Sequence, residues 1–128
     1  MIYLDTSVTL AHLLGEDRVP PAALWEELLV SSRLLEYELW TRLHARGAGR
    51  PAAEAARALL GRVALAELSP LVLERTLEPF PAPVRTLDAL HLATAAYLRG
   101  QGQPVRLATY DDRMAAVGHR MGIPRFDC

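Results

Sequence analysis

Four acidic residues stand where carboxylates could meet and hold a metal ion. Asp5 follows the short apolar run Ile2–Leu4, and Asp111 follows a second such run late in the chain. Glu38 and Asp88 each lie near the start of a segment with helical periodicity. Carboxylates without His or Cys partners favour Mg²⁺ or Mn²⁺ over zinc. Carboxylate-bound Mg²⁺ that also contacts phosphate oxygens is suited to phosphodiester hydrolysis, so we expect that chemistry here.

Each acid also has a purely structural interpretation. Asp5 could open a turn, Asp88 could complement a helix dipole, and Asp111 could cap a helix. Glu38 could pair with Arg42, one helical turn further on. A helical wheel, however, places Glu38 inside an apolar arc, where a carboxylate needs a partner or a function.

Neighbouring acids compete for two of these roles. Glu36 precedes Glu38 and falls nearer Trp40 on the wheel, which makes it the second choice for the glutamate. Asp112 directly follows Asp111 and could open the same helix. The residues alone leave both alternatives open.

Short apolar runs alternate with helical segments, and this pattern predicts the elements that position the acids. Strands are expected at Ile2–Leu4, Leu28–Val30, Val63–Leu68, Val105–Thr109 and, as a short fifth strand, Ile123–Phe126. Helices are expected at Val8–Leu14, Ala22–Leu28, Leu34–Arg46, Ala52–Leu60, from Ser69-Pro70 onward, at Leu87–Arg99, and from Asp111 or Asp112 to near Gly122. Expected N-caps include Thr6 or Ser7, and Thr86. The pattern predicts an α/β fold with a parallel sheet covered on both faces, and the carboxyl ends of its strands would gather the acids at one edge.

Composition excludes several other chemistries. All 14 positive charges are arginine, because the chain has no lysine, so a Schiff-base or phosphate-loop lysine is impossible. The absence of lysine also argues against aspartyl-phosphate phosphatases and phospho-receiver domains. Arg42, Arg46 and Arg50 recur every four residues, which is typical of either an RNA-backbone contact or a solvated helix face.

Four stretches of the chain resemble the motifs of PIN-domain ribonucleases, and in detail those of VapC toxins. The stretches are Leu4-Asp-Thr-Ser7, Ser32-Arg-Leu-Leu-Glu-Tyr-Glu-Leu39, Leu87-Asp-Ala-Leu-His-Leu-Ala-Thr94 and Leu107-Ala-Thr-Tyr-Asp111. The resemblance covers nearly the whole chain. It implies a single PIN domain over residues 1–128, with a three-layer α/β/α sandwich around a mainly parallel sheet of four to five strands.

The resemblance also implies an activity and a site. The activity is that of a Mg²⁺- or Mn²⁺-dependent endoribonuclease, the toxin of a toxin–antitoxin pair. Matched by position, the catalytic and metal-binding residues are Asp5, Glu38, Asp88 and Asp111. Thr6 and Thr109 match hydroxyl positions at the edge of such a site. His91 could border the cleft, although a helix-packing role is the simpler interpretation.

The resemblance implies partners as well: an RNA substrate, a VapB-type antitoxin and a second copy in a homodimer. Some of Trp25, Leu28, Leu29, Leu35, Leu39 and Trp40 are expected to line a groove for the antitoxin. The alternative function is a catalytically inactive PIN-like module that dimerises and holds a partner peptide. A lone cysteine, no apolar run of membrane-spanning length and no recognisable secretion signal lead us to expect a cytoplasmic protein.

Overall fold

The computed structural model describes all 128 residues and is built on a parallel sheet. Its strands are β1 (Ile2–Leu4), β2 (Leu29–Ser32), β3 (Val63–Ala66) and β4 (Arg106–Ala108), in the order β3-β2-β1-β4. Every adjacent pair is parallel, as predicted. The expected fifth strand at Ile123–Phe126 is reduced to one bridge between Leu107 and Arg125, so the sheet has four strands.

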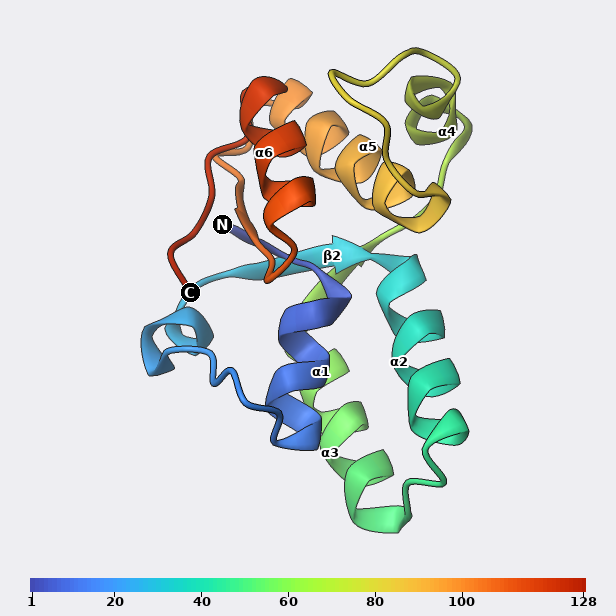
Figure 1. Cartoon of the computed structure of the whole chain (residues 1–128), viewed down its shortest axis with the longest axis vertical. Helices are drawn as coiled ribbons and strands as arrows, with labels where there is room; N and C mark the ends of the chain where they lie inside the picture. Colours follow the sequence, from blue (N-terminus) through green and yellow to red (C-terminus); the bar gives the residue numbers. More distant parts are fainter.

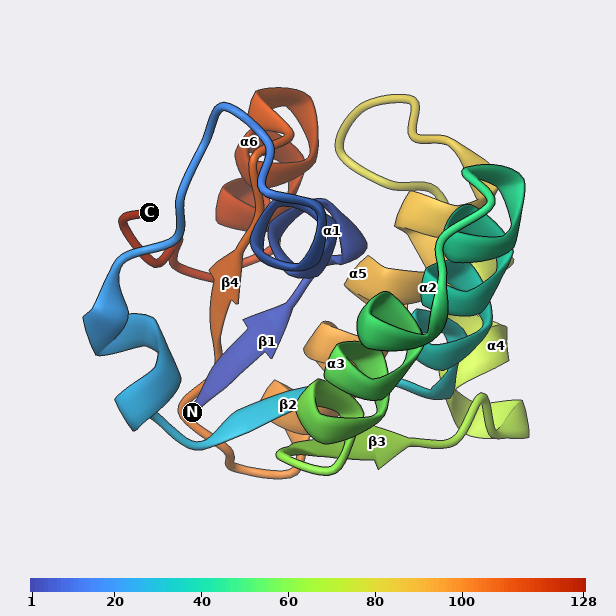
Figure 2. The same cartoon turned by 90° about the horizontal axis from the view of Figure 1, so that it is seen from below.

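Helices cover both faces of this sheet. They are α1 (Thr6–Leu14), the 3-10 helix η1 (Ala22–Glu26), α2 (Arg33–Ala45), α3 (Arg50–Leu60), α4 (Pro70–Thr76), α5 (Thr86–Gly100) and α6 (Asp112–Arg120). Figure 1 shows α1, α2 and α3 on one side of the sheet and α4, α5 and α6 on the other. Figure 2 shows the four strands side by side, with α1 and α3 in front of them. The predicted α/β/α three-layer fold is confirmed.

Alternation along β1 divides the apolar core between the two faces. Ile2 and Leu4 are buried toward α1 and α2, and Tyr3 between them is buried toward α5 and α6. This follows from the two-residue period of a strand. All three side chains are fully buried because β1 is a central strand with helices on both sides.

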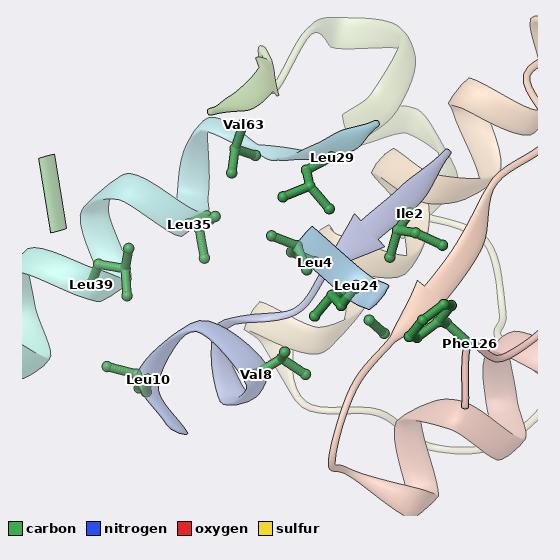
Figure 3. Close-up of a cluster of buried hydrophobic side chains, with 11 residues drawn as sticks. Ile2, Leu4, Val8, Leu10, Leu24, Leu29, Leu35, Leu39, Val63 and Phe126 are labelled. Carbon is green, nitrogen blue, oxygen red and sulfur yellow. The ribbon is translucent and has the colours of Figure 1, made fainter. Parts of the chain in front are cut away.

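The core on the α1 and α2 face includes several residues that were expected to line a partner groove. Figure 3 shows Leu29, Leu35 and Leu39 packed among the other apolar side chains of this cluster. They are at most 6% exposed, so the expectation of a groove is wrong for these three. Leu28, in contrast, is 74% exposed.

Local signals place most helix starts correctly, with two exceptions. Ser32 and Ser69 cap α2 and α4, each accepting a hydrogen bond from a backbone N–H of the first turn. Thr86 is instead the first helical residue of α5, and Arg85 occupies the N-cap position. Likewise, neither Thr6 nor Ser7 caps α1, because Asp5 holds that position. The hydroxyls of Thr6 and Ser7 instead have partners in the site described below.

None of the helices combines the length and the apolar character needed to cross a lipid bilayer.

Candidate active site

A cleft of about 790 Å³ collects the four predicted acids. We call it the acidic cleft. Its carboxylate-bearing walls are formed by Asp5, Glu38, Asp88 and Asp111, together with Glu16 and Asp17. The four acids come from the end of β1, from α2, from the start of α5 and from the segment after β4. The structure therefore brings together side chains that are far apart in the sequence.

Two hydroxyl groups fix the carboxylate of Asp5. Its Oδ2 accepts hydrogen bonds from Ser7 Oγ at 2.7 Å and from Thr109 Oγ1 at 2.8 Å. Asp5 is 6% exposed, so these donors replace water around one oxygen. Its Oδ1 makes no hydrogen bond. Asp5 holds the N-cap position of α1, but its side chain makes no cap hydrogen bond.

Thr109 also connects Asp5 to Asp111. Its Oγ1 accepts a hydrogen bond from the Asp111 backbone N–H at 3.0 Å while donating to Asp5. Asp111 is the N-cap of α6, and its Oδ1 accepts hydrogen bonds from the backbone N–H groups of Arg113 and Met114. Asp111 therefore has a structural role, which leaves its Oδ2 without a partner.

The carboxylate of Glu38 is anchored in the same way as that of Asp5. Its Oε1 accepts a hydrogen bond from Thr6 Oγ1 at 2.9 Å and lies 2.6 Å from His91 Nε2. His91 is 1% exposed, and its Nδ1 lies 2.7 Å from the Tyr3 hydroxyl. Burial raises the pKa of that hydroxyl, so Tyr3 keeps its proton. His91 is therefore packed inside the fold and does not border the acidic cleft itself, but it contacts Glu38, which does.

Asp88 differs from the other acids because its carboxylate has no hydrogen bond or ion pair. Burial raises the pKa of Asp88 above its ordinary value of 3.8, and the negative charges of Asp5 and Asp111 raise it further. A half-buried carboxylate that faces two others is a site of uncompensated negative charge. An oxygen-binding cation would relieve it, so the donor set fits Mg²⁺ or Mn²⁺. No three His, Cys, Asp or Glu side chains are grouped closely enough to form a closed metal shell by themselves. Water and phosphate oxygens would have to complete the coordination.

The two competing acids lie away from the cleft. Glu36 forms an ion pair with Arg33 at 3.0 Å. Asp112 has a side chain that is 80% exposed and pairs with Arg125 at 3.0 Å. The structure therefore places Glu38 rather than Glu36, and Asp111 rather than Asp112, on the acidic cleft.

Arginines also line the cleft. They are Arg18, Arg42, Arg46 and Arg85. Arg46 pairs with Glu16 at 3.7 Å, and Arg18 donates to the Tyr110 carbonyl at 3.0 Å. Arg42 and Arg85 have no ion-pair partner, so their guanidinium groups are free for a ligand.

Sequence reasoning found some of these arginines and missed others. The four-residue repeat pointed to Arg42 and Arg46, and it also included Arg50, which does not line the cleft. Arg18 and Arg85 were missed because they lie outside periodic segments. Ser7 was noticed only as a possible cap, although its position two residues after Asp5 was a signal for the contact it makes.

Comparison with known proteins defines the family. The family model of the PIN domain matches residues 2–120. The chain belongs to the PIN-domain family. It is 34% identical to ribonuclease VapC46 of Mycobacterium tuberculosis over 95% of this chain and 93% of that protein. It is 31% identical to ribonuclease VapC35 of the same species over 96% and 93% of the two chains.

A solved structure agrees with this assignment. The chain superposes on the crystal structure of VapC20, a sarcin–ricin loop cleaving toxin from M. tuberculosis, with a TM-score of 0.70. The two chains are 25% identical, and the match covers 92% of this chain and 95% of VapC20. The predicted PIN fold and the resemblance to VapC ribonucleases are therefore confirmed. The roles of the individual acids remain predictions.

Proposed function

We propose that this PIN-domain chain is an endoribonuclease of the VapC type that acts as the toxin of a toxin–antitoxin pair. Relatives named ribonucleases match nearly its whole length. The observation that carries the proposal is the acidic cleft, where four carboxylates from separate segments face one another. Such a concentration of like charge destabilises the metal-free fold, so its presence supports a role in binding a cation.

Asp5, Glu38, Asp88 and Asp111 are proposed to hold Mg²⁺ or Mn²⁺. When bound, the ion would neutralise charge on a scissile phosphate and make a bound water more acidic. Asp5 offers Oδ1 and Glu38 offers Oε2, since the other oxygen of each carboxylate is occupied by two donors. Asp88 is the acid with no competing partner, and its raised pKa supports a direct role in holding a cation.

The remaining polar groups have orienting roles in this proposal. Ser7 and Thr109 keep the Asp5 carboxylate from rotating, and Thr6 does the same for Glu38. Asp111 has one oxygen committed to the start of α6, so we assign its Oδ2 to a hydrogen bond from the attacking water. Thr6 and Thr109 are thus proposed to border the site, as the motifs suggested.

Arginines at the acidic cleft are proposed to bind the RNA backbone. Arg42 and Arg85 have no internal ion pair, and guanidinium groups bind phosphate oxygens in bidentate fashion. These guanidinium groups would hold the phosphates on either side of the scissile phosphate, and the scissile phosphate itself would lie over the carboxylates. This charge arrangement also disfavours the alternative of an inactive peptide-binding module, because such a module would need neither group.

The same family relation supports a VapB-type antitoxin and a homodimer as proposed partners. Co-expression with the product of an adjacent antitoxin gene, followed by purification of a stable complex, tests the first. Sedimentation of the partner-free chain at micromolar concentration tests the second.

Mapping cleavage sites on a panel of RNAs with Mg²⁺, Mn²⁺ or chelator tests the activity. Asp5→Asn removes one charge at nearly constant shape, and its amide oxygen can still accept from Ser7 and Thr109. We expect it to lose at least about 100-fold in metal-dependent cleavage, since even residues that only orient metal ligands cost 10–100-fold. Asp112→Asn is the matched control and should cleave like wild type. If Asp5→Asn cleaved RNA at the wild-type rate, the proposed site would be refuted. If the wild type cleaved no RNA, the proposed function would be refuted.

A further inference from the structure

The carboxylate of Glu38 is held from inside the protein by a residue that does not line the acidic cleft. His91 Nε2 lies 2.6 Å from Glu38 Oε1, and it is 3.4 Å from the hydroxyl of Thr6 that donates to the same oxygen. Glu38 is 13% exposed at its side chain, whereas His91 is 1% exposed. The imidazole therefore approaches Glu38 from the buried side.

Hydrogen-bond chemistry fixes the direction of this contact. An ionised carboxylate only accepts, so His91 Nε2 must carry the proton and donate it to Glu38. In a neutral imidazole Nδ1 is then an acceptor, and it faces the hydroxyl of Tyr3 at 2.7 Å. The phenol then donates to Nδ1, which reinforces the Nε2–H tautomer that the carboxylate of Glu38 requires. One chain of hydrogen bonds thus runs from Tyr3 through His91 to Glu38.

Packing leaves this chain little freedom to move. Tyr3 belongs to β1, His91 to α5 and Glu38 to α2, so three separate elements would have to shift together. The rings of Tyr3 and His91 meet edge to face, with centroids 5.7 Å apart and planes inclined at 77°. Both side chains are fully buried, which removes water as a competing partner.

The carboxylate of Glu38 is held in the same way as the carboxylate of Asp5. In each carboxylate, two donors hold one oxygen and the other oxygen has no hydrogen bond. Asp5 is held by Ser7 and Thr109, and Glu38 by Thr6 and His91. A buried polar chain that only satisfied the core would not need to end on a residue of the acidic cleft.

We propose that Tyr3 and His91 form a buried positioning chain that fixes the rotamer of Glu38 and leaves Oε2 for the ligand of the acidic cleft. His91 is a positioning residue in this scheme, because it acts through Glu38. The role given to these hydrogen bonds, which is to prepare Glu38 for a ligand, rests on the proposed function. Their geometry can be tested without metal or RNA.

The first test is the tautomer of His91 in the metal-free protein. Long-range ¹H–¹⁵N NMR correlations, recorded at a pH where the imidazole is neutral, should show one tautomer with the proton on Nε2. Tyr3→Phe removes only the donor to Nδ1, so the ¹⁵N resonance of Nδ1 should move toward that of an imidazole nitrogen without a hydrogen bond, while Nε2 keeps its proton. Tyr97→Phe is the matched control, because the Tyr97 hydroxyl on the same helix, α5, makes no hydrogen bond. An Nδ1–H tautomer in the wild type, or an unchanged Nδ1 resonance in Tyr3→Phe, overturns the proposal.

The second test is Mn²⁺ affinity, measured by calorimetry beside the melting temperature of each metal-free variant. His91→Leu should weaken binding about 10–100-fold, as loss of an orienting partner does. His91→Gln keeps an N–H near the Nε2 position and should recover much of this loss. Tyr3→Phe should bind more weakly than wild type while remaining folded, and Tyr97→Phe should bind normally. A purely structural role would lower the melting temperatures without this order of affinities.

The outcomes separate the two proposals. If the wild type binds Mn²⁺ and cleaves RNA, but the folded variants bind Mn²⁺ as tightly as the wild type, only the proposed positioning role of Tyr3 and His91 is overturned. A wild-type protein that binds no Mn²⁺ overturns the proposed function, and with it the purpose assigned to the chain. The NMR result then still decides whether Tyr3 donates to Nδ1 of His91.

Discussion

Replacing Thr109 by Val should destabilise the protein, because it removes a buried hydroxyl that links Asp5 to Asp111. Thr109 is fully buried, and its hydroxyl makes two bonds at once, donating to Asp5 at 2.8 Å and accepting from the Asp111 N–H at 3.0 Å. A hydrogen bond to a charged group contributes about 1.5–3 kcal/mol, and a buried donor left unpaired costs about 1–3 kcal/mol. Ser7 still holds Asp5, and the half-buried Asp111 can recover part of its loss from water. We therefore expect a net cost of about 2–4 kcal/mol.

The measurement is thermal unfolding in chelator, so that no metal offsets the change. For a chain of this size about 1 kcal/mol corresponds to roughly 4 °C, which gives a drop of roughly 8–16 °C for Thr109→Val. Thr109→Ser keeps the hydroxyl and loses one methyl group, which should cost about 1 kcal/mol. The expected order of stability is wild type, then Thr109→Ser, then Thr109→Val. If Thr109→Val is as stable as Thr109→Ser, the hydroxyl does not hold Asp5 and Asp111 together as described.

Two further predictions concern charge at the acidic cleft. The raised pKa of Asp88 means that its contribution to stability is fully present below about pH 3.8 and is lost as the pH rises through the higher folded-state pKa. Metal-free Asp88→Asn should therefore unfold at a higher temperature than wild type at pH 7. The difference in melting temperature should shrink as the pH falls toward 3.8. A difference that does not change with pH would contradict an origin in the charge of Asp88. Arg42→Ala and Arg85→Ala should each weaken RNA binding and reduce the slope of log affinity against log salt by about 0.7, as expected for one lost contact to single-stranded phosphate. Arg50→Ala, outside the cleft, should leave that slope unchanged, and an equal effect from it would mean that binding is not localised there.

Local sequence patterns determined most of the secondary structure and the order of the elements. The apolar run Ile2–Leu4 predicts β1 because strand formers precede an acid and a helical segment. Ser32 and Ser69 predict the starts of α2 and α4, because a serine can accept a backbone hydrogen bond in the first turn. These signals depend on a few neighbouring residues, so they can be recognised in the sequence without the folded structure.

The same local rules failed where a side chain had a better partner elsewhere. Thr6 has the right residue type and place to cap α1, but its hydroxyl donates to Glu38 instead. Ser7 likewise donates to Asp5. A capping hydroxyl accepts from backbone N–H groups of the first turn. Thr6 and Ser7 instead lie inside α1, and their hydroxyls donate to carboxylates outside the helix.

Helical geometry favoured Glu38 over Glu36, but it gave no preference between Asp111 and Asp112. The apolar arc around Glu38 indicated a buried position for this residue, and Glu36, two positions earlier, points to Arg33 on a more exposed side. Asp111 and Asp112 could not be separated in this manner, because adjacent residues at a helix start have equally good capping signals. The packing of α6 decided between them, leaving Asp112 paired with Arg125 at the surface.

The contacts that complete the site were set by the tertiary structure alone. Tyr3 reads as an ordinary strand residue and His91 as an ordinary helix residue, and 88 positions separate them. Their hydrogen bond exists because β1 turns Tyr3 toward α5, while α2 brings Glu38 to the other side of the same imidazole. Residue types and periods determine which element forms and which face is apolar. Which two polar groups meet across that packing depends on how whole helices dock on the sheet, and no local pattern contains that information.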